Sequence, residues 1–438
     1  MFVGFLAALL LIAFVLGAIF TTAQVFPGTF VAQAYQGGLA LYDQVTSYDD
    51  VHKTDLWHPA RMEQQGVSVS ASSRAQQGVT LFTAGDGPVV RLVDMDGRVL
   101  HEWRKPFSEV WTAEQSSIRD PQPDSHVYFR KAHLFPNGDL LAIYEGVGDS
   151  PYGYGMVKLD RNSKIIWTYF GRTHHSFDIG EDGRIYVLTH EISNEEIPSF
   201  GHLAPPRMDD QLAVLSPDGQ ELQRIDLIKA VANSPYAHLL HTVSFYSVQD
   251  PLHSNDVEVI GAAEASKLPF ADEGQILLSF RELNALAILD PMSGTLVWAA
   301  RGSWIGQHDP DITEDGHILL FDNYGRFNGP EGNSRVIEFD PTTQEITWQF
   351  PGDSGHPLHS AIRSSQQRLA NGNTLITESS GGRILEVTRQ GDLVWEYVHP
   401  LRGGAKNDLI PIVCFAERID PSTLDPELLL PGSQTQPL

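Results

Sequence analysis

Several histidines, one arginine and two asparagines recur at matching places in a repeated sequence pattern. An imidazole can act as nucleophile, acid or base near neutral pH, and a guanidinium offers a planar fork of donors to oxyanions. Transfer of an anionic group needs such a nucleophile together with fixed donors around the moving charge. The residues that combine these properties are His175, His253, Asn255, Arg281, His308 and Asn323.

The repeated pattern is a glycine-containing turn, an apolar strand, a second turn and another strand that often ends in Trp. It is clearest from His308 to Trp348 and occurs six times between Gly78 and Trp395. Repeats of about 40–50 residues, each with four short strands, are typical of propeller blades. The sequence therefore predicts an all-β protein built as a six-bladed β-propeller.

Hairpin turns at Asn-Gly, Asp-Gly or Glu-Gly pairs give the repeats a common register. Seven residues after the glycine stand Glu145, His190, Arg281, Asn323 and Ser379. Eight residues before it stand Arg130, His175, His308 and Ser364, with the fourth blade uncertain because of an insertion. These positions face one another in a plain antiparallel hairpin. The alignment predicts three contacts in one polar layer, which are His308 with Asn323, His175 with His190 and Arg130 with Glu145.

Structural roles compete with functional ones for the same residues. Arg281 could simply pair with Glu282 or Asp256, and strand alternation turns His174 away from the face of His175. The Trp residues at strand ends are expected to pack between strands. Convergence of several polar groups in one layer is what favours a functional site.

Bulk composition excludes several classes of protein. The 438 residues carry a formal net charge of −25, which argues against a nucleic-acid partner. The single cysteine, Cys414, excludes an internal disulfide framework and any Cys-rich metal site. We expect neither a metal nor another cofactor. The sequence makes no prediction of oligomeric state.

The amino terminus is apolar and uncharged. Residues 1–20 are long enough to span a bilayer, and we expect an uncleaved transmembrane signal anchor rather than a cleaved signal. Residues 21–77 are expected to be a connector, 78–418 the propeller and 419–438 a surface tail. The propeller is then expected on the periplasmic or extracytoplasmic side, attached to the membrane through the helix.

The first blade shows three strands instead of four. They are expected at Val79–Ala84, Pro88–Met95 and Arg98–Trp103. The apolar run Leu409–Ala416, after the last blade, is the candidate for the missing strand. Pairing the two ends of the domain in this way leaves the ring no open edge.

The chain resembles the bacterial arylsulfotransferases that do not use phosphoadenosine phosphosulfate. The resemblance lies in His253-Ser-Asn255, Leu278-Ser-Phe-Arg281, Gly306-Gln-His308-Asp, Phe321-Asp-Asn323 and the stretch from Gly382 to Tyr397. It covers about residues 78–400. Better-known members carry an additional N-terminal β-sandwich and a disulfide, so the chain resembles a shorter branch of the family.

The resemblance implies a six-bladed propeller that moves a sulfuryl group from an aryl sulfate to a phenol through a sulfohistidine. His308 resembles the nucleophile, and His175 resembles a second imidazole of the site. His253, Asn255 and Arg281 resemble the groups that hold the sulfuryl oxygens. Asn323 and Thr377 are the expected substrate-binding positions.

Two other functions are compatible with a propeller, since fold alone does not decide function. One is a non-catalytic, membrane-tethered scaffold or ligand-binding module. The other is a quinoprotein, which the count of six repeats and the lack of a vicinal cysteine pair disfavour.

Overall fold

The computed structural model describes residues 2–22, 25, 28, 50–326, 332–353 and 355–430. These fall into two compact units, Met1–Thr54 and Asp55–Leu438. In the first unit, Phe2–Thr22 form helix α1 and Val51–Lys53 form the short helix η1. Among the residues described, no helix combines the length and hydropathy needed to cross a membrane, so the expected transmembrane anchor is not supported. Most of the first half of the expected connector lies outside the described residues.

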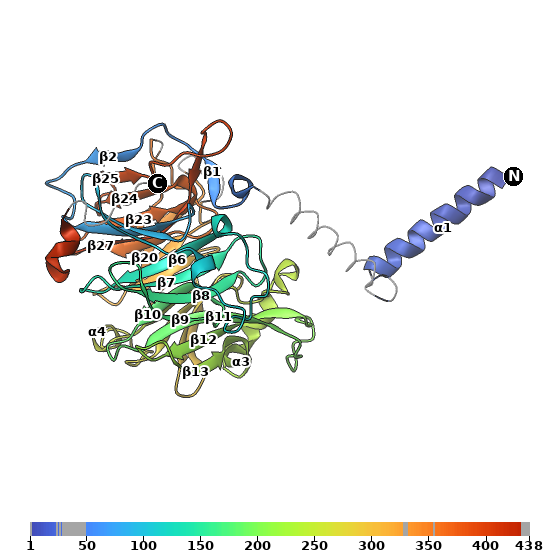
Figure 1. Cartoon of the computed structure of the whole chain (residues 1–438). Helices are drawn as coiled ribbons and strands as arrows, with labels where there is room; N and C mark the ends of the chain where they lie inside the picture. Colours follow the sequence, from blue (N-terminus) through green and yellow to red (C-terminus); the bar gives the residue numbers. More distant parts are fainter. Residues whose placement is uncertain are drawn as a thin grey trace. The chain divides into compact units, whose positions relative to one another are not determined.

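The second unit is the six-bladed β-propeller that the repeats predict (Figure 1). From the innermost strand outward, the first blade consists of β27 (Val413–Ile419), β3 (Val79–Ala84), β4 (Val89–Val93) and β5 (Val99–Arg104). The second blade consists of β6 (Val127–Leu134), β7 (Leu140–Gly146), β8 (Gly153–Leu159) and β9 (Ile165–Tyr169). The third blade consists of β10 (Thr173–Ile179), β11 (Ile185–Ser193), β12 (Arg207–Leu215) and β13 (Glu221–Asp226).

The last three blades follow the same antiparallel order. The fourth blade consists of β14 (Ser254–Val259), β15 (Ile276–Phe280), β16 (Ala285–Asp290) and β17 (Thr295–Arg301). The fifth blade consists of β18 (His308–Ile312), β19 (Ile318–Asp322), β20 (Arg335–Phe339) and β21 (Ile346–Phe350). The sixth blade consists of β22 (Ser365–Arg368), β23 (Thr374–Glu378), β24 (Arg383–Val387) and β25 (Leu393–Val398). Short helices in the connections are η2 (Phe107–Glu109), η3 (Asp124–His126), α3 (Leu227–Ala232), η4 (Ala237–Thr242), η5 (Phe245–Ser247), α4 (Ala262–Ala265), η6 (Ser379–Gly381), η7 (Pro421–Thr423) and η8 (Pro426–Leu429).

The carboxy-terminal strand closes the ring, as expected. In the pairing of β27 with β3, Val413 lies opposite Ala84 and Ile419 opposite Val79. The strand begins later than predicted, because Leu409–Pro411 form β26, which pairs with β1 (Trp57–Pro59). The two termini of the propeller therefore complete one blade, and β3 has no open edge.

Segments on both sides of the expected propeller also belong to the second unit. Strand β2 (Gly66–Ser70), within the expected connector, pairs with β25 as a fifth strand of the last blade. In the expected surface tail, Leu424 and Leu428 are buried in the core beside the first two blades. Residues 431–438 of that tail lie outside the described part of the chain.

The core is formed between blades, and the strand-end Trp residues hydrogen-bond across its seams. Trp103 donates its indole N–H to the carbonyl of Gly138 in the next blade at 3.1 Å. Trp395, in the last blade, donates to Met95 of the first blade at 3.0 Å. The expected packing role is confirmed, and each bond also fastens one blade to its neighbour.

Bulges interrupt the innermost strand of five blades near the strand's first residues. The backbone there is left-handed at three residues, with φ of 54° at His175, 45° at His253 and 53° at Asp309. A bulge adds one residue to a strand and redirects its side chains, and residues other than glycine adopt such φ values mainly where the surrounding fold enforces them. These bulges decide which side chains face the centre of the ring.

Candidate active site

A narrow cavity at the centre of the ring is lined by two consecutive residues from every blade. The pairs are Arg130-Lys131, His175-Ser176, Asn255-Asp256, His308-Asp309, Ser364-Ser365 and Cys414-Phe415. The aligned positions of the second, third, fifth and sixth blades thus meet in one layer, as the repeats predict. The structure adds Asn255 and Cys414 as the equivalents in the fourth and first blades.

His308 is held in one orientation by three hydrogen bonds. Its Nδ1 lies 3.0 Å from the carbonyl oxygen of Gly306 and 2.8 Å from Oδ1 of Asn323. Asn323 is itself fixed, because its Nδ2 donates to the carbonyls of Ser360 and Arg363. Both partners of Nδ1 are acceptors, so Nδ1 carries the proton. Nε2 keeps the lone pair, which accepts a 3.2 Å hydrogen bond from the Arg363 amide.

His308 is a neutral imidazole. Burial holds the pKa of His308 well below 6.5, and the positive charges of Arg281 and Arg130 lower it further. The Nε2 lone pair is therefore present at neutral pH and is the basic, nucleophilic atom of the ring. A group that bonds to Nε2 must first displace the amide of Arg363.

The pairing of His308 with Asn323 is confirmed, although the strand register differs from the prediction. Phe321, not Asn323, is the backbone partner of His308. Next to the turn Ile312 already lies opposite Ile318 instead of Leu319, and the bulge between His308 and Asp311 shifts the ladder by one more residue. The side chains still meet, since Asn323 follows directly after β19 and turns back toward the ring.

The two other predicted pairs are joined by neither a hydrogen bond nor a ring contact among the residues that the structure describes. The ring of His174, not that of His175, stacks on His190, with ring centroids 4.4 Å apart and an interplanar angle of 18°. Glu145 accepts from the Tyr128 hydroxyl at 2.5 Å and from the His175 amide at 2.7 Å, and no bond joins it to Arg130. In the backbone ladders Tyr128, not Arg130, lies opposite Glu145, and Thr173, not Ser176, lies opposite Thr189; both inner strands, β6 and β10, contain a bulge.

His175 and His253 are neighbours, with ring centroids 5.0 Å apart. His175 lines the cavity, and its Nδ1 lies 2.8 Å from Nδ1 of buried His174. Burial, followed by the charge of His253, holds the pKa of His175 well below 6.5. His253 stands behind it, with its own Nδ1 hydrogen-bonded to Asp250.

Arg281 is neutralised by an adjacent carboxylate. Its Nε and Nη2 donate to Oε1 of Glu282 at 3.0 and 2.6 Å, which is one of the structural alternatives that the sequence left open. Arg281 does not line the central cavity, yet its charge contributes to the lowered pKa of His308.

Asn255 and Thr377 each retain an unpartnered polar atom within the described residues. Nδ2 of Asn255 donates to the carbonyl of Gln307 at 2.7 Å, while its buried Oδ1 has no hydrogen bond. The hydroxyl of Thr377 is buried without a partner, on β23 opposite Ser365. The structure thus brings His175, Asn255 and His308 together at the cavity, surrounds them with His253, Arg281 and Asn323, and places Thr377 one strand further out.

Nine of the twelve residues that line the cavity were not among the predicted site residues, and Arg130 and Cys414, which occupy positions equivalent to His308, are two of these nine. Arg130 occupies the aligned position of the second blade, so the repeat register itself could have identified it. Cys414 lies on the closing strand, for which the sequence offers no aligned turn. Burial raises the pKa of the Cys414 thiol to about 12, so the thiol stays protonated and is a poor nucleophile.

His174, His190 and Asp210 form a buried cluster with ligand atoms within 4.8 Å of one another. A shared metal must lie in the plane of each coordinating imidazole, and stacked rings tilted by 18° have no such common point nearby. The amide of Gly153 also donates to Nε2 of His190 at 3.1 Å, which leaves the proton on Nδ1. This geometry suits a hydrogen-bonded support for His175 better than a metal site.

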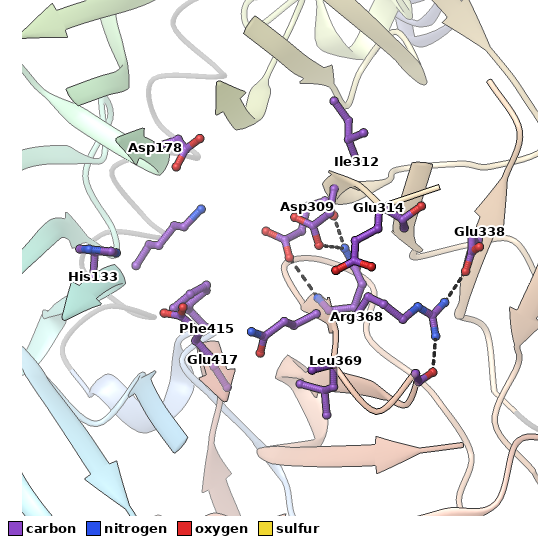
Figure 2. Close-up of a pocket in the computed structure, with 18 of the residues that line it drawn as sticks. His133, Asp178, Asp309, Ile312, Glu314, Glu338, Arg368, Leu369, Phe415 and Glu417 are labelled. Carbon is purple, nitrogen blue, oxygen red and sulfur yellow. Dashed lines mark hydrogen bonds and ion pairs between the residues drawn. The ribbon is translucent and has the colours of Figure 1, made fainter. Parts of the chain in front are cut away.

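A larger cavity of about 660 Å³ continues the channel toward the hairpin turns. Figure 2 shows Asp178, Asp309 and Glu417 around it. Burial raises the pKa of Glu417 and of Asp256 to about 7. Lys131 is half-buried among these acids. Burial opposes its charge, but Asp256 and Asp309 outweigh that effect and raise the pKa of Lys131. An anionic substrate is repelled from this acidic side.

A family model described as arylsulfotransferase (ASST) matches residues 131–400, which is more than half of the chain. The chain therefore belongs to the arylsulfotransferase family. Among proteins with curated descriptions, none matches it.

Solved structures are similar to this chain at low sequence identity. A protein of unknown function from Bacteroides caccae is 11% identical, with a TM-score of 0.48, over 77% of this chain and 99% of that one. A streptogramin B lyase is 12% identical, with a TM-score of 0.41, over 83% and 97% of the two chains. Virginiamycin B lyase from Staphylococcus aureus is 13% identical, with a TM-score of 0.41, over 80% and 87%. These likenesses carry no argument about activity.

Proposed function

We propose that the protein transfers a sulfuryl group from an aryl sulfate to a phenolic acceptor, with His308 carrying the group in between. The observation that supports this most directly is the neutral imidazole of His308 at the centre of the ring. Its Nδ1–H is held by Asn323 and Gly306, and its Nε2 carries the lone pair, which accepts from the Arg363 amide. The motif around His308 also lies inside the segment matched by the family model.

In the first half-reaction, Nε2 of His308 attacks sulfur. The N–S bond forms as the S–O bond to the aryl oxygen breaks, and the phenolate leaves with the electron pair. Sulfurylation makes the Nδ1–H more acidic, so the hydrogen bond to Asn323 strengthens as charge develops. In the second half-reaction the acceptor oxygen attacks sulfur, and the N–S bond breaks to restore His308.

The neighbouring residues have distinct tasks in this scheme. The leaving phenolate takes its proton from solvent. In the second half-reaction His175, which is neutral at rest, removes the proton of the acceptor phenol and then releases it to solvent. Contacts of Arg281, His253 and Asn255 with the sulfuryl oxygens stay predictions, and they require Arg281 to leave Glu282 and Nδ2 of Asn255 to leave the Gln307 carbonyl. Asn323 orients His308, and a contact of Thr377 with the aryl group stays a prediction. The extracytoplasmic location of the propeller also stays a prediction.

The test is release of phenol from 4-nitrophenyl sulfate in the absence of any acceptor. Wild-type protein should release one equivalent in a burst and gain the mass of one SO₃ on the peptide that contains His308. His308→Ala should show neither, whereas the matched control His101→Gln, on outer strand β5, should keep both. A full burst from His308→Ala rules out the nucleophile. A wild type that is inactive on a panel of aryl sulfates favours a non-catalytic module instead.

A further inference from the structure

The guanidinium of Arg130 is buried in the central cavity without a carboxylate partner. Only 6% of the residue is exposed, and it forms no ion pair among residues 50–326, 332–353 and 355–430. Its Nη1 donates to the carbonyl of Cys414 at 2.8 Å, while Nε is buried with no hydrogen bond. An unpaired buried charge is strongly unfavourable unless a counter-charge arrives.

The other basic residues near the channel show how unusual this is. Adjacent Lys131 lies among Asp178, Asp256 and Asp309 and donates to Ser176 at 3.0 Å. Arg281 is bound by Glu282. Arg130 is therefore the channel-lining cation whose charge is least compensated by the chain itself.

The position of Arg130 is fixed by the fold. A bulge between Phe129 and Ala132 places Arg130 and Lys131 on the cavity wall, beside His175, Asn255 and His308. The charge of Arg130 contributes to the lowered pKa of both His175 and His308, so the guanidinium acts on the same space as the two imidazoles. The residue stands just before the segment that the family model matches, so the family assignment does not account for it.

We propose that Arg130 binds a tetrahedral sulfur oxyanion in the central cavity, with its unpartnered Nε–H directed at a sulfuryl oxygen. Free sulfate and the sulfuryl end of an aryl sulfate share this chemistry. In the second case Arg130 is the residue that holds the donor in place for His308, and that assignment rests on the proposed function. A planar guanidinium suits either ligand, because its parallel N–H groups match two oxygens of one SO₃ group.

Binding is best measured with ligands that cannot react. We would titrate the full-length protein with inorganic sulfate and with 4-nitrobenzenesulfonate at matched ionic strength. The sulfonate cannot transfer its SO₃ group, because a C–S bond replaces the S–O bond of the ester. Arg130→Gln should weaken the sulfonate by about 10- to 100-fold, the usual range for losing a charge-assisted hydrogen bond. Arg130→Lys should recover part of the affinity. Arg281→Gln, which removes a paired cation, should have the smaller effect. Sulfate binding without sulfonate binding would assign the site to the free anion.

Thermal stability separates a ligand-binding role from a structural one. Arg130→Gln should unfold at the wild-type temperature or above it in chloride, because it removes an uncompensated charge. Sulfate should raise the unfolding temperature of wild type and leave that of Arg130→Gln unchanged. Loss of stability together with unchanged anion affinity would overturn the proposal. Anion binding that depends on Arg130, in a protein that transfers no sulfuryl group, would support the role of Arg130 and rule out the proposed function. Sulfuryl transfer by the wild type, with undiminished anion affinity in Arg130→Gln, would support the proposed function and rule out the role of Arg130.

Discussion

Oδ1 of Asn323 lies 2.8 Å from Nδ1 of His308. Asn323 follows β19, the second strand of blade five, and it determines which nitrogen of His308, on the first strand β18, carries the proton. The amide group cannot flip freely, because its Nδ2 is committed to two backbone carbonyls. The acceptor end therefore always faces His308, and the lone pair always stays on Nε2.

Asn323→Ala should slow the burst of phenol release by about 10²-fold, because the ring then samples the wrong tautomer and orientation. Asn323→Asp keeps an acceptor at the same place and should lose less. Stopped-flow release of 4-nitrophenol measures both rates. Equal loss in the two variants, at equal thermal stability, would show that the oxygen does not matter.

Glu282→Gln should lower the KM for an aryl sulfate, since it removes the charge that neutralises Arg281. The Gln oxygen can still accept the hydrogen bond that Ser247 makes to Glu282 at 2.5 Å, so the fold should be preserved. Steady-state kinetics at constant ionic strength give the comparison. An unchanged KM would mean that the charge of Arg281 does not reach the substrate.

The burst rate should be constant from alkaline pH down through 6.5. The pKa values of His308 and His175 lie well below 6.5, so both rings stay neutral where an ordinary histidine would protonate. Activity should decline only in acid, below the depressed pKa values. Single-turnover rates across a pH series measure this, and a midpoint near 6.5 would contradict the burial of these rings.

The same rings should make the fold sensitive to acid. The unfolded chain binds protons at an ordinary histidine pKa of 6.5, whereas the folded chain does not. The free energy of unfolding contributed by these groups is therefore complete above 6.5 and decreases as pH falls below it.

Glu417→Gln should stabilise the propeller at neutral and alkaline pH. Burial raises the pKa of Glu417 from 4.5 to about 7, so the folded state holds a proton that the unfolded state has lost between those values. The wild type should thus lose stability relative to the variant as pH rises from 4.5 through 7. Unfolding temperatures at pH 4.5 and 8 test this, and a difference that is the same at both values would contradict it.

Trp395→Phe should destabilise the seam between the last and first blades by about 1–3 kcal/mol, through loss of the buried hydrogen bond to Met95. Trp167→Phe is the matched control, because its bond to the carbonyl of Pro217 at 3.2 Å lies in an exposed place and should contribute less. Chemical denaturation curves give both values. A larger loss for Trp167→Phe would show that the indole N–H is not what holds the seam.

Much of the fold could be predicted because the repeat carries it. Turn glycines and alternating strands gave six blades, and the missing strand of the first blade pointed to the carboxy terminus. The layer containing His308 and His175 followed from counting back from the turns. Counting failed where it assumed a plain two-residue turn and an unbroken ladder: His174, not His175, stacks on His190, and Tyr128, not Arg130, lies opposite Glu145. The position of a bulge depends on how neighbouring blades pack, and the sequence of a single repeat does not contain that information.

Closure by β27 also sets an order of events during synthesis. Arg418 donates to the hydroxyl of Thr80, although 338 residues separate them. Until the last strand has left the ribosome, β3 presents a bare edge and the cavity lacks the wall formed by Cys414 and Phe415. The complete ring, and with it any chemistry at His308, therefore arises only after Val413–Ile419 have been synthesised. A chain truncated before Val413 has no inner strand for its first blade.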